Sequence, residues 1–125
     1  MSREYRDHIL DLLSPLRGVS ARAMFGGYGL YRSGLMFAII VDDALYFKVT
    51  DLNRADFEAA GAEPFQYTSK GKAVTLSYWS APPETLDDES ALLDWAEKSC
   101  RAARESRDSK TQKRPVAKKS SKTKR

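Results

Sequence analysis

Two short turns within an apolar stretch constrain this fold more than any other feature of the sequence. Residues 27–32, 35–41 and 44–49 are rich in aromatic and β-branched residues, which favour strands. Only Ser33-Gly34 and Asp42-Asp43 separate them. Connections this short join antiparallel neighbours and leave no room for a parallel crossover. The stretch therefore predicts an antiparallel sheet, with residues 35–41, apolar on both faces, in its centre.

Helical patterns precede and follow these strands. Apolar residues at i, i+4, i+7 and i+8 predict a helix over residues 3–14. Residues 52–60 lie between an N-cap motif and Gly61, which predicts a second helix. A third helix is expected from the acidic segment 87–89 to about Glu105.

Two further strands are expected over residues 65–69 and 73–79, around a turn at 70–72. Residues 21–25 are compatible with either a short extra strand or a lead-in to 27–32. The predicted order is α-β-β-β-α-β-β-α. We expect an α+β fold with two layers, in which helices pack on one face of an antiparallel sheet.

The second face of such a sheet is a candidate interaction surface. Alternation turns the odd-numbered residues of 44–49 inward, and it predicts an inward set of Val74, Leu76 and Tyr78 that leaves Trp79 outside. Aromatic residues mixed with lysine can stack bases or anchor a protein. The third helix or a second copy of the chain would be the alternative cover for this face. The predicted patch contains Tyr31, Met36, Ile40, Tyr46, Lys48 and Trp79, and the partner-binding candidates within it are Tyr31, Tyr46, Lys48 and Trp79.

Three glycines gather at the start of the first predicted strand, namely Gly26, Gly27 and Gly29. A phosphate-binding loop needs a helix N-terminus aimed at the anion, whereas a strand follows here. The spacing also differs from the P-loop and dinucleotide motifs. We therefore interpret the glycines as a structural motif, at a bulge or at a close approach of two backbone segments.

The sequence assembles no catalytic or metal site. His8 is the only histidine and Cys100 the only cysteine, which excludes an internal disulfide and multi-histidine or multi-thiolate metal sites. We expect His8 at the surface, Cys100 as a packed side chain, and the acids of 84–89 as stabilisers of a helix start. We predict a non-enzymatic cytoplasmic protein with no cofactor, no metal and no membrane span.

Positive charge is concentrated at the end of the chain. The formal net charge is +4, yet residues 107–125 hold nine bases against one acid, and residues 1–106 hold 12 bases against 16 acids. The terminal segment has no Leu, Ile or aromatic residue, so it buries too little apolar surface to offset the entropy of ordering. We predict a folded domain over 1–106 and a disordered basic tail over 107–125 that attracts nucleic acid without sequence preference. A solubilising end without a partner is the alternative. The tail candidates for nucleic-acid binding are Lys113, Arg114, Lys118, Lys119, Lys122, Lys124 and Arg125.

Six blocks, in this order, resemble the N-terminal domain of the TfoX/Sxy family. They are RAMFGGYGLY at 22–31, LYFKV at 45–49, NRADF at 53–57, PFQY at 64–67, VTLSY at 74–78 and LLDWA at 92–96. The resemblance covers about residues 3 to 105. It implies a secretion-chaperone-like α+β fold. It also implies a regulator of natural competence genes that acts at promoters with the cyclic-AMP receptor protein, and not by catalysis.

The function expected from these features is that of a small regulatory protein. Its folded body would bind a protein partner, which the resemblance places in the transcription machinery, and its tail would be attracted to DNA. Full-length competence regulators of the family carry a helical C-terminal domain, in whose place this chain has the basic tail. A protein-binding or chaperone-like module unrelated to DNA is the alternative. Both a monomer and a homodimer are compatible with the sequence.

Overall fold

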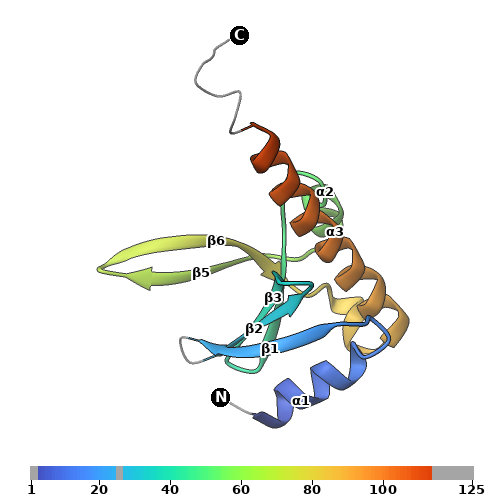
Figure 1. Ribbon diagram of the computed structural model, residues 1–125. Coiled ribbons are helices and arrows are strands. Elements are labelled where there is room, and N and C mark those ends of the chain that lie inside the picture. The colour runs from blue at the N-terminus through green and yellow to red at the C-terminus, as the bar shows by residue number, and fades with distance from the viewer. Residues whose placement is uncertain (1–2, 25–26, 114–125) are drawn as a thin grey trace.

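The computed structural model describes residues 3–24 and 27–113, which form an antiparallel sheet with helices on one side (Figure 1). The β5–β6 hairpin extends away from the helices. Nowhere in these two ranges is a helix both long and apolar enough to cross a membrane. In chain order the elements are α1 (Arg3–Leu12), β1 (Val19–Met24), β2 (Gly27–Arg32), β3 (Leu35–Val41), β4 (Ala44–Lys48), α2 (Arg54–Ala59), β5 (Pro64–Ser69), β6 (Lys72–Ser80), the 3₁₀ helix η1 (Pro83–Leu86) and α3 (Glu89–Lys113).

The predicted α+β fold is confirmed, with one strand more than expected. Among the described residues, six strands form one antiparallel sheet in the order β1-β2-β3-β4-β6-β5. The additional strand is β1, which pairs with β2 from Val19 opposite Arg32 to Met24 opposite Gly27. The stretch before β2 is therefore a strand and not a lead-in. β3 lies inside the sheet, as its two apolar faces predicted.

The tight turns are built from residues that tolerate a left-handed backbone. Ser33 and Gly34 have φ values of 55° and 81°, and Asp42 and Asp43 have 52° and 58°. Two-residue hairpins of right-handed twist need positive φ at both positions, which Gly and Asp accept most easily. These short turns hold β2, β3 and β4 in one meander.

The end of β4 is tied to two helices by buried polar groups. The Lys48 carbonyl oxygen accepts hydrogen bonds from Asn53 Nδ2 and Ser99 Oγ, each at 3.0 Å. Asn53 Oδ1 also accepts a hydrogen bond from the Thr50 amide at 2.7 Å. Asn53 is thus part of the turn that leads into α2, which explains why α2 begins later than the expected residue 52.

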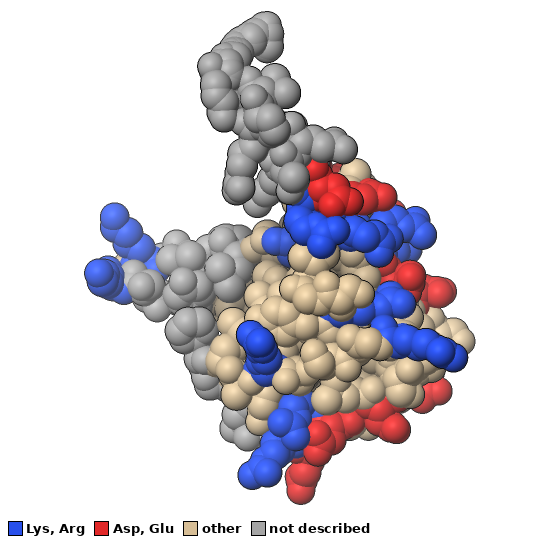
Figure 2. Space-filling model, in the orientation of Figure 1, with Lys and Arg blue, Asp and Glu red and all other residues tan. Residues whose placement is uncertain are grey.

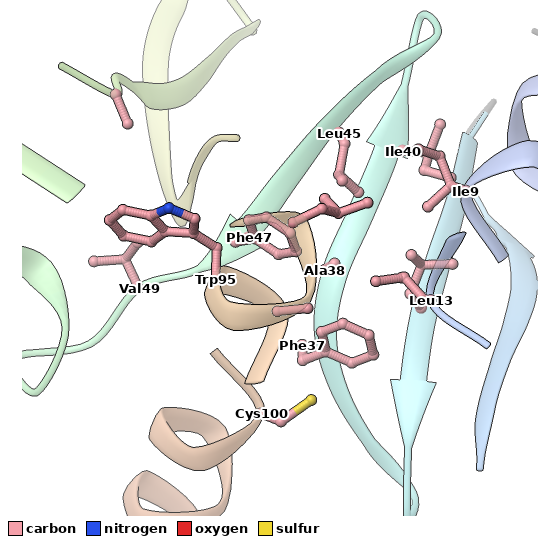
Figure 3. Packing of buried hydrophobic residues seen from close by; sticks show 14 of the residues in the cluster. Ile9, Leu13, Phe37, Ala38, Ile40, Leu45, Phe47, Val49, Trp95 and Cys100 are labelled. Atoms are coloured by element: carbon pink, nitrogen blue, oxygen red, sulfur yellow. The ribbon is translucent and has the colours of Figure 1, made fainter. Parts of the chain in front are cut away.

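The core lies between the sheet and the helices (Figure 3). Phe37, Phe47 and Phe57 are fully buried. The Phe57 ring packs edge-on against Phe47, at 6.3 Å between centroids, and against Trp95 of α3, at 4.8 Å. Cys100 belongs to the same cluster, so its expected role as a packed side chain is confirmed.

The expected end of the third helix near Glu105 is wrong, because α3 continues to Lys113. Among the side chains that the structure describes, the last buried one of α3 is Ala103, yet Gly and Pro are absent from there until Pro115. Good helix formers such as Arg, Glu and Lys continue the helix over this interval. Residues 107–113 of the expected tail are therefore the last turns of α3. The candidates outside the described residues are Arg114, Lys118, Lys119, Lys122, Lys124 and Arg125, for which the disordered tail stays a prediction.

Candidate functional site

The pairing of β4 with its neighbours distinguishes the two faces of the sheet. Phe47 lies opposite Ala38 on one side and Trp79 on the other, whereas Lys48 lies opposite Tyr78. Side chains of directly opposed residues share a face. Since Phe47 and Ala38 belong to the core, Lys48 and Tyr78 lie on the face turned away from the helices.

We call this second surface the tyrosine face. Its register runs across four strand pairs, from Arg22 opposite Gly29 to Lys48 opposite Tyr78. In Figure 2 the middle of the molecule is largely uncharged, and acidic side chains lie mainly at its edges. The residues of the tyrosine face are Arg22, Met24, Gly29, Tyr31, Met36, Ile39, Tyr46, Lys48 and Tyr78.

Two aromatic residues of β6 have the opposite orientation to that predicted. Trp79 packs against the core cluster, and Tyr78 lies on the tyrosine face. Because Tyr78 and Trp79 are both large and amphipathic, alternation within β6 does not decide which one points inward; the pairing with β4 does. Trp79 is therefore removed from the partner-binding candidates. The side chains of Val74 and Leu76 lie outside the described residues.

Ile40 is the second error in the predicted patch, because its side chain is fully buried in the core. The pairing of β2 with β3 shifts by one residue between Leu30, opposite Ala38, and Tyr31, opposite Met36. This irregularity leaves Phe37 as an extra residue on β3 and reverses the alternation. Met36 thus keeps its predicted place beside Tyr31 on the tyrosine face.

The tyrosine face contains cations held over aromatic rings. The Arg22 guanidinium lies 5.5 Å from the Tyr31 ring centroid, and the Lys48 ammonium lies 5.3 Å from that of Tyr78. Lys48 Nζ also donates a hydrogen bond to Ser77 Oγ at 3.0 Å. Such contacts limit the conformations of the long cationic side chains and favour their use in recognition.

The side chains of the tyrosine face differ in the fraction that is exposed to solvent. Ile39 and Tyr78 are 6% and 8% exposed. Tyr31 and Tyr46 beside them are half-buried. Burial raises the pKa of Tyr78 to about 12, and the nearby Tyr31 adds to this rise. The Tyr78 phenol therefore remains a neutral hydrogen-bond donor at ordinary pH.

The glycines of β2 lie where a side chain would collide with its surroundings. A Cβ on Gly27 would be 2.1 Å from the Ile40 carbonyl oxygen, which is a close approach of two backbone segments. A Cβ on Gly29 would meet the sulfur atoms of Met36 and Met24 at 2.7 and 2.8 Å. Gly26 lies outside the described residues.

The titratable residues that the sequence analysis considered do not come together in one site. His8 is exposed on α1. The Asp88 carboxylate accepts hydrogen bonds from the amides of Ser90, at 2.9 Å, and Ala91, at 3.3 Å, so it caps α3. Within residues 3–24 and 27–113, no group of three or more His, Cys, Asp or Glu side chains is placed to hold a metal.

A second candidate site, which the sequence did not reveal, is a cavity of about 230 Å³ beside α3. It lies between one face of α3, the β2–β3 hairpin and the loop after α1. Figure 2 shows Lys and Arg side chains gathered beside this helix. We call the cavity the arginine pocket, and its lining residues are Arg17, Arg32, Ser33, Leu35, Glu97, Cys100, Arg104 and Arg107.

Arg32 connects the parts of this pocket through hydrogen bonds. Its Nε donates a hydrogen bond to the Arg17 carbonyl oxygen and its Nη1 donates one to Glu97 Oε1, both at 3.1 Å. A hydrogen bond with Cys100 raises the pKa of Arg32, and the charge of Glu97 adds to this rise. Burial raises the pKa of the Cys100 thiol, although Arg32 acts in the opposite direction. Cys100 therefore lines the pocket as an uncharged thiol and is a poor nucleophile.

One pattern could have pointed to the arginine pocket. Glu97, Cys100, Arg104 and Arg107 follow the i, i+3, i+7, i+10 spacing of one helical face. The other two arginines come from distant parts of the chain, and only the fold brings them to this face.

Comparisons with known proteins identify the family of this chain. Residues 11–103 match the family described as the TfoX N-terminal domain. The chain is also 26% identical, over 107 residues, to a DNA transformation protein TfoX1 of Aliivibrio fischeri (strain ATCC 700601 / ES114). The alignment covers 86% of this chain and 51% of the relative, so the chain spans about half the length of that protein. Because the matched residues include most of both layers, the chain belongs to the TfoX N-terminal domain family.

Proposed function

We propose that this protein is a non-enzymatic regulator that binds a protein partner through the tyrosine face, while its basic tail is attracted to DNA. The observation that carries the proposal is a sheet face of half-buried tyrosines and cations over which no described helix lies. Protein interfaces are enriched in aromatic residues and arginine and depleted of acids at their centre. The tyrosine face has this composition.

The family relationship supports the regulatory part of the proposal. The chain is related to competence regulators, which are not known as enzymes. One relative is named a DNA transformation protein. We extend a role at DNA to this chain because nine bases against one acid follow residue 106. A cytoplasmic setting is part of the same proposal.

The partner interaction is tested by affinity capture from a nuclease-treated lysate. The full chain is compared with Tyr46→Ser, on the tyrosine face, and Leu52→Ser, which replaces a 61% exposed side chain before α2. We expect Tyr46→Ser to lose the captured protein and Leu52→Ser to retain it. Equal capture by both variants would refute the partner site. If the captured protein is a second copy of this chain, sedimentation will show a homodimer that Tyr46→Ser dissociates.

The DNA interaction is tested by salt titration of duplex binding. Replacing Lys118, Lys119, Lys122 and Lys124 by Gln removes four positive charges from the full chain. The slope of log K against log salt should flatten by about 3 to 4, because each neutralised phosphate contributes about 0.9. An unchanged slope would favour a protein-binding or chaperone-like module without a role at DNA.

A further inference from the structure

The arginine pocket is an unusual concentration of like charge. Four arginines and one glutamate line a cavity of about 230 Å³, and two of the four arginines are paired with an acid. Within the described residues, Arg17 and Arg104 form no ion pair with an acid. Glu97 pairs with Arg32, and Asp108 pairs with Arg107. An anion would relieve the repulsion among these guanidinium groups.

One arginine of the pocket is held in place by the fold before any ligand binds. Arg32 is held by the Arg17 carbonyl oxygen on one side and by Glu97 on the other. Its side chain is only 25% exposed. Arg104 and Arg107 are one turn apart on α3, so the helix places both side chains on the same side, toward the pocket. A ligand that binds Arg32 therefore loses less free energy to the ordering of that side chain.

The size and the charge of the arginine pocket limit the class of ligand that it can bind. The cavity is smaller than the roughly 300 to 1,000 Å³ of sites for drug-sized molecules, so it would accept a compact group. Guanidinium groups bind phosphate in a bidentate manner, and a phosphate monoester carries about −1.5 to −2 charges at neutral pH. We propose that the arginine pocket binds a phosphate group, with Arg17, Arg32 and Arg104 as its ligands.

This inference does not depend on the tyrosine face or on the tail. Phosphate could reach the pocket as a free or small-molecule phosphate or as part of a nucleic-acid backbone. Since α3 carries Arg104 and Arg107 and continues toward the basic segment, the backbone of a nucleic acid is a natural source. The experiment therefore includes both sources.

The test is a titration of the full chain with inorganic phosphate at constant ionic strength, followed by ¹H–¹⁵N NMR. Saturable shifts are expected at Arg17, Ser33 and Arg104. Arg104→Gln should raise the phosphate Kd about tenfold, the effect of losing one charge-assisted hydrogen bond. Arg101→Gln is the matched control, because it removes the same charge from an exposed position of α3 outside the pocket.

A second variant tests the same site in the opposite direction. Glu97→Gln removes the negative charge that competes with phosphate for the arginines and keeps a side-chain oxygen that can accept the hydrogen bond from Arg32 Nη1, so it should lower the phosphate Kd by about threefold. The NMR spectra also verify that each variant is folded. Equal Kd values for Arg104→Gln and Arg101→Gln, or shifts confined to residues outside the pocket, would overturn the proposal.

A short DNA duplex then distinguishes the two sources. If the phosphate belongs to nucleic acid, the duplex will compete with inorganic phosphate, and Arg104→Gln will weaken duplex binding more than Arg101→Gln does. If the source is a small molecule, the two variants will bind the duplex equally, and only the inorganic phosphate Kd will differ. Either result retains the phosphate site. The tail variant with four Lys→Gln changes should leave the phosphate Kd unaltered, which separates this inference from the proposed role of the tail.

Discussion

The two faces of the sheet are built from the same strands but differ in chemistry. Toward the helices, β3 and β4 present Phe37, Ile40 and Phe47, which are fully buried. On the tyrosine face the neighbouring positions hold side chains such as Tyr46 and Lys48, which are half-buried. Aliphatic and phenyl groups contribute stability only when they are removed from water, whereas tyrosine and lysine can remain partly solvated. We infer that the helix-covered face stabilises the fold and that the tyrosine face is available for recognition.

The largest expected effect tests this division within β4. Phe47→Ala should lower the free energy of unfolding by about 3 to 5 kcal/mol, because it leaves a cavity in the core. Tyr46→Ala, one residue away on the other face, should cost about 1 kcal/mol through its edge-on contact with Phe65. Urea denaturation measures both values. A loss for Tyr46→Ala as large as that for Phe47→Ala would contradict the division.

The two glycines of β2 give the next largest effect. Gly27→Ala should cost about 2 to 3 kcal/mol, since the new methyl group would strike the backbone carbonyl of Ile40. Gly29→Ala meets mainly the flexible ends of Met24 and Met36, so about 1 kcal/mol is expected. Thermal unfolding of the two variants provides the comparison, and the reverse ranking would show that the thioethers are held rigidly.

Alkaline pH should reveal the buried phenol of the tyrosine face. The pKa of Tyr78 is about 12 in the folded protein, against 10.0 for an unperturbed tyrosine. Above pH 10 the unfolded chain loses this proton first, so the stabilising contribution is complete below pH 10 and is lost as the pH rises toward 12. Tyr78→Phe should therefore flatten the decline in stability over this range in urea denaturation. Tyr46→Phe is the control, and an equal flattening by both variants would argue against a special role of burial at Tyr78.

The smallest expected effect concerns the cation of the tyrosine face. Lys48→Gln removes the contact with the Tyr78 ring, and the free energy of unfolding should fall by about 0.5 to 1 kcal/mol. The same variant should weaken partner capture more than it weakens the fold. A change confined to stability would assign Lys48 to the fold alone.

The parts of the fold that were predictable from sequence are those decided by neighbouring residues. The turns at Ser33-Gly34 and Asp42-Asp43 determine where β2, β3 and β4 begin and end, because few residue types accept positive φ. The opposite orientations of Phe47 and Lys48 could also be predicted from the sequence, since one side chain is apolar and the other charged. These features need no information about distant parts of the chain.

The features that were not predictable depend on pairing between distant segments. Trp79 faces the core because Phe47, far away in the sequence, lies opposite it. The pairing of β4 with β6 cannot be obtained from a local pattern. The error at Ile40 has another origin, because the register shift at Tyr31 lies within the β2–β3 hairpin and leaves no mark in the alternation of apolar residues in β3. The arginine pocket, like the pairing of β4 with β6, depends on distant segments, since Arg17 and Arg32 meet Arg104 only after folding.

Because α3 is long, a residue inserted into it would displace every residue of the helix that follows. The helix continues from its last buried residue, Ala103, to Lys113 without a break. An inserted residue in this interval would rotate everything after it by about 100° and advance it by about 1.5 Å, because a helix transmits such a change along its axis. An insertion after Arg107 would therefore leave the pocket intact and redirect the chain that follows, whereas one before Arg104 would dismantle the pocket. The pitch of α3 thus relates the position of the pocket to the position at which the helix ends, at Lys113.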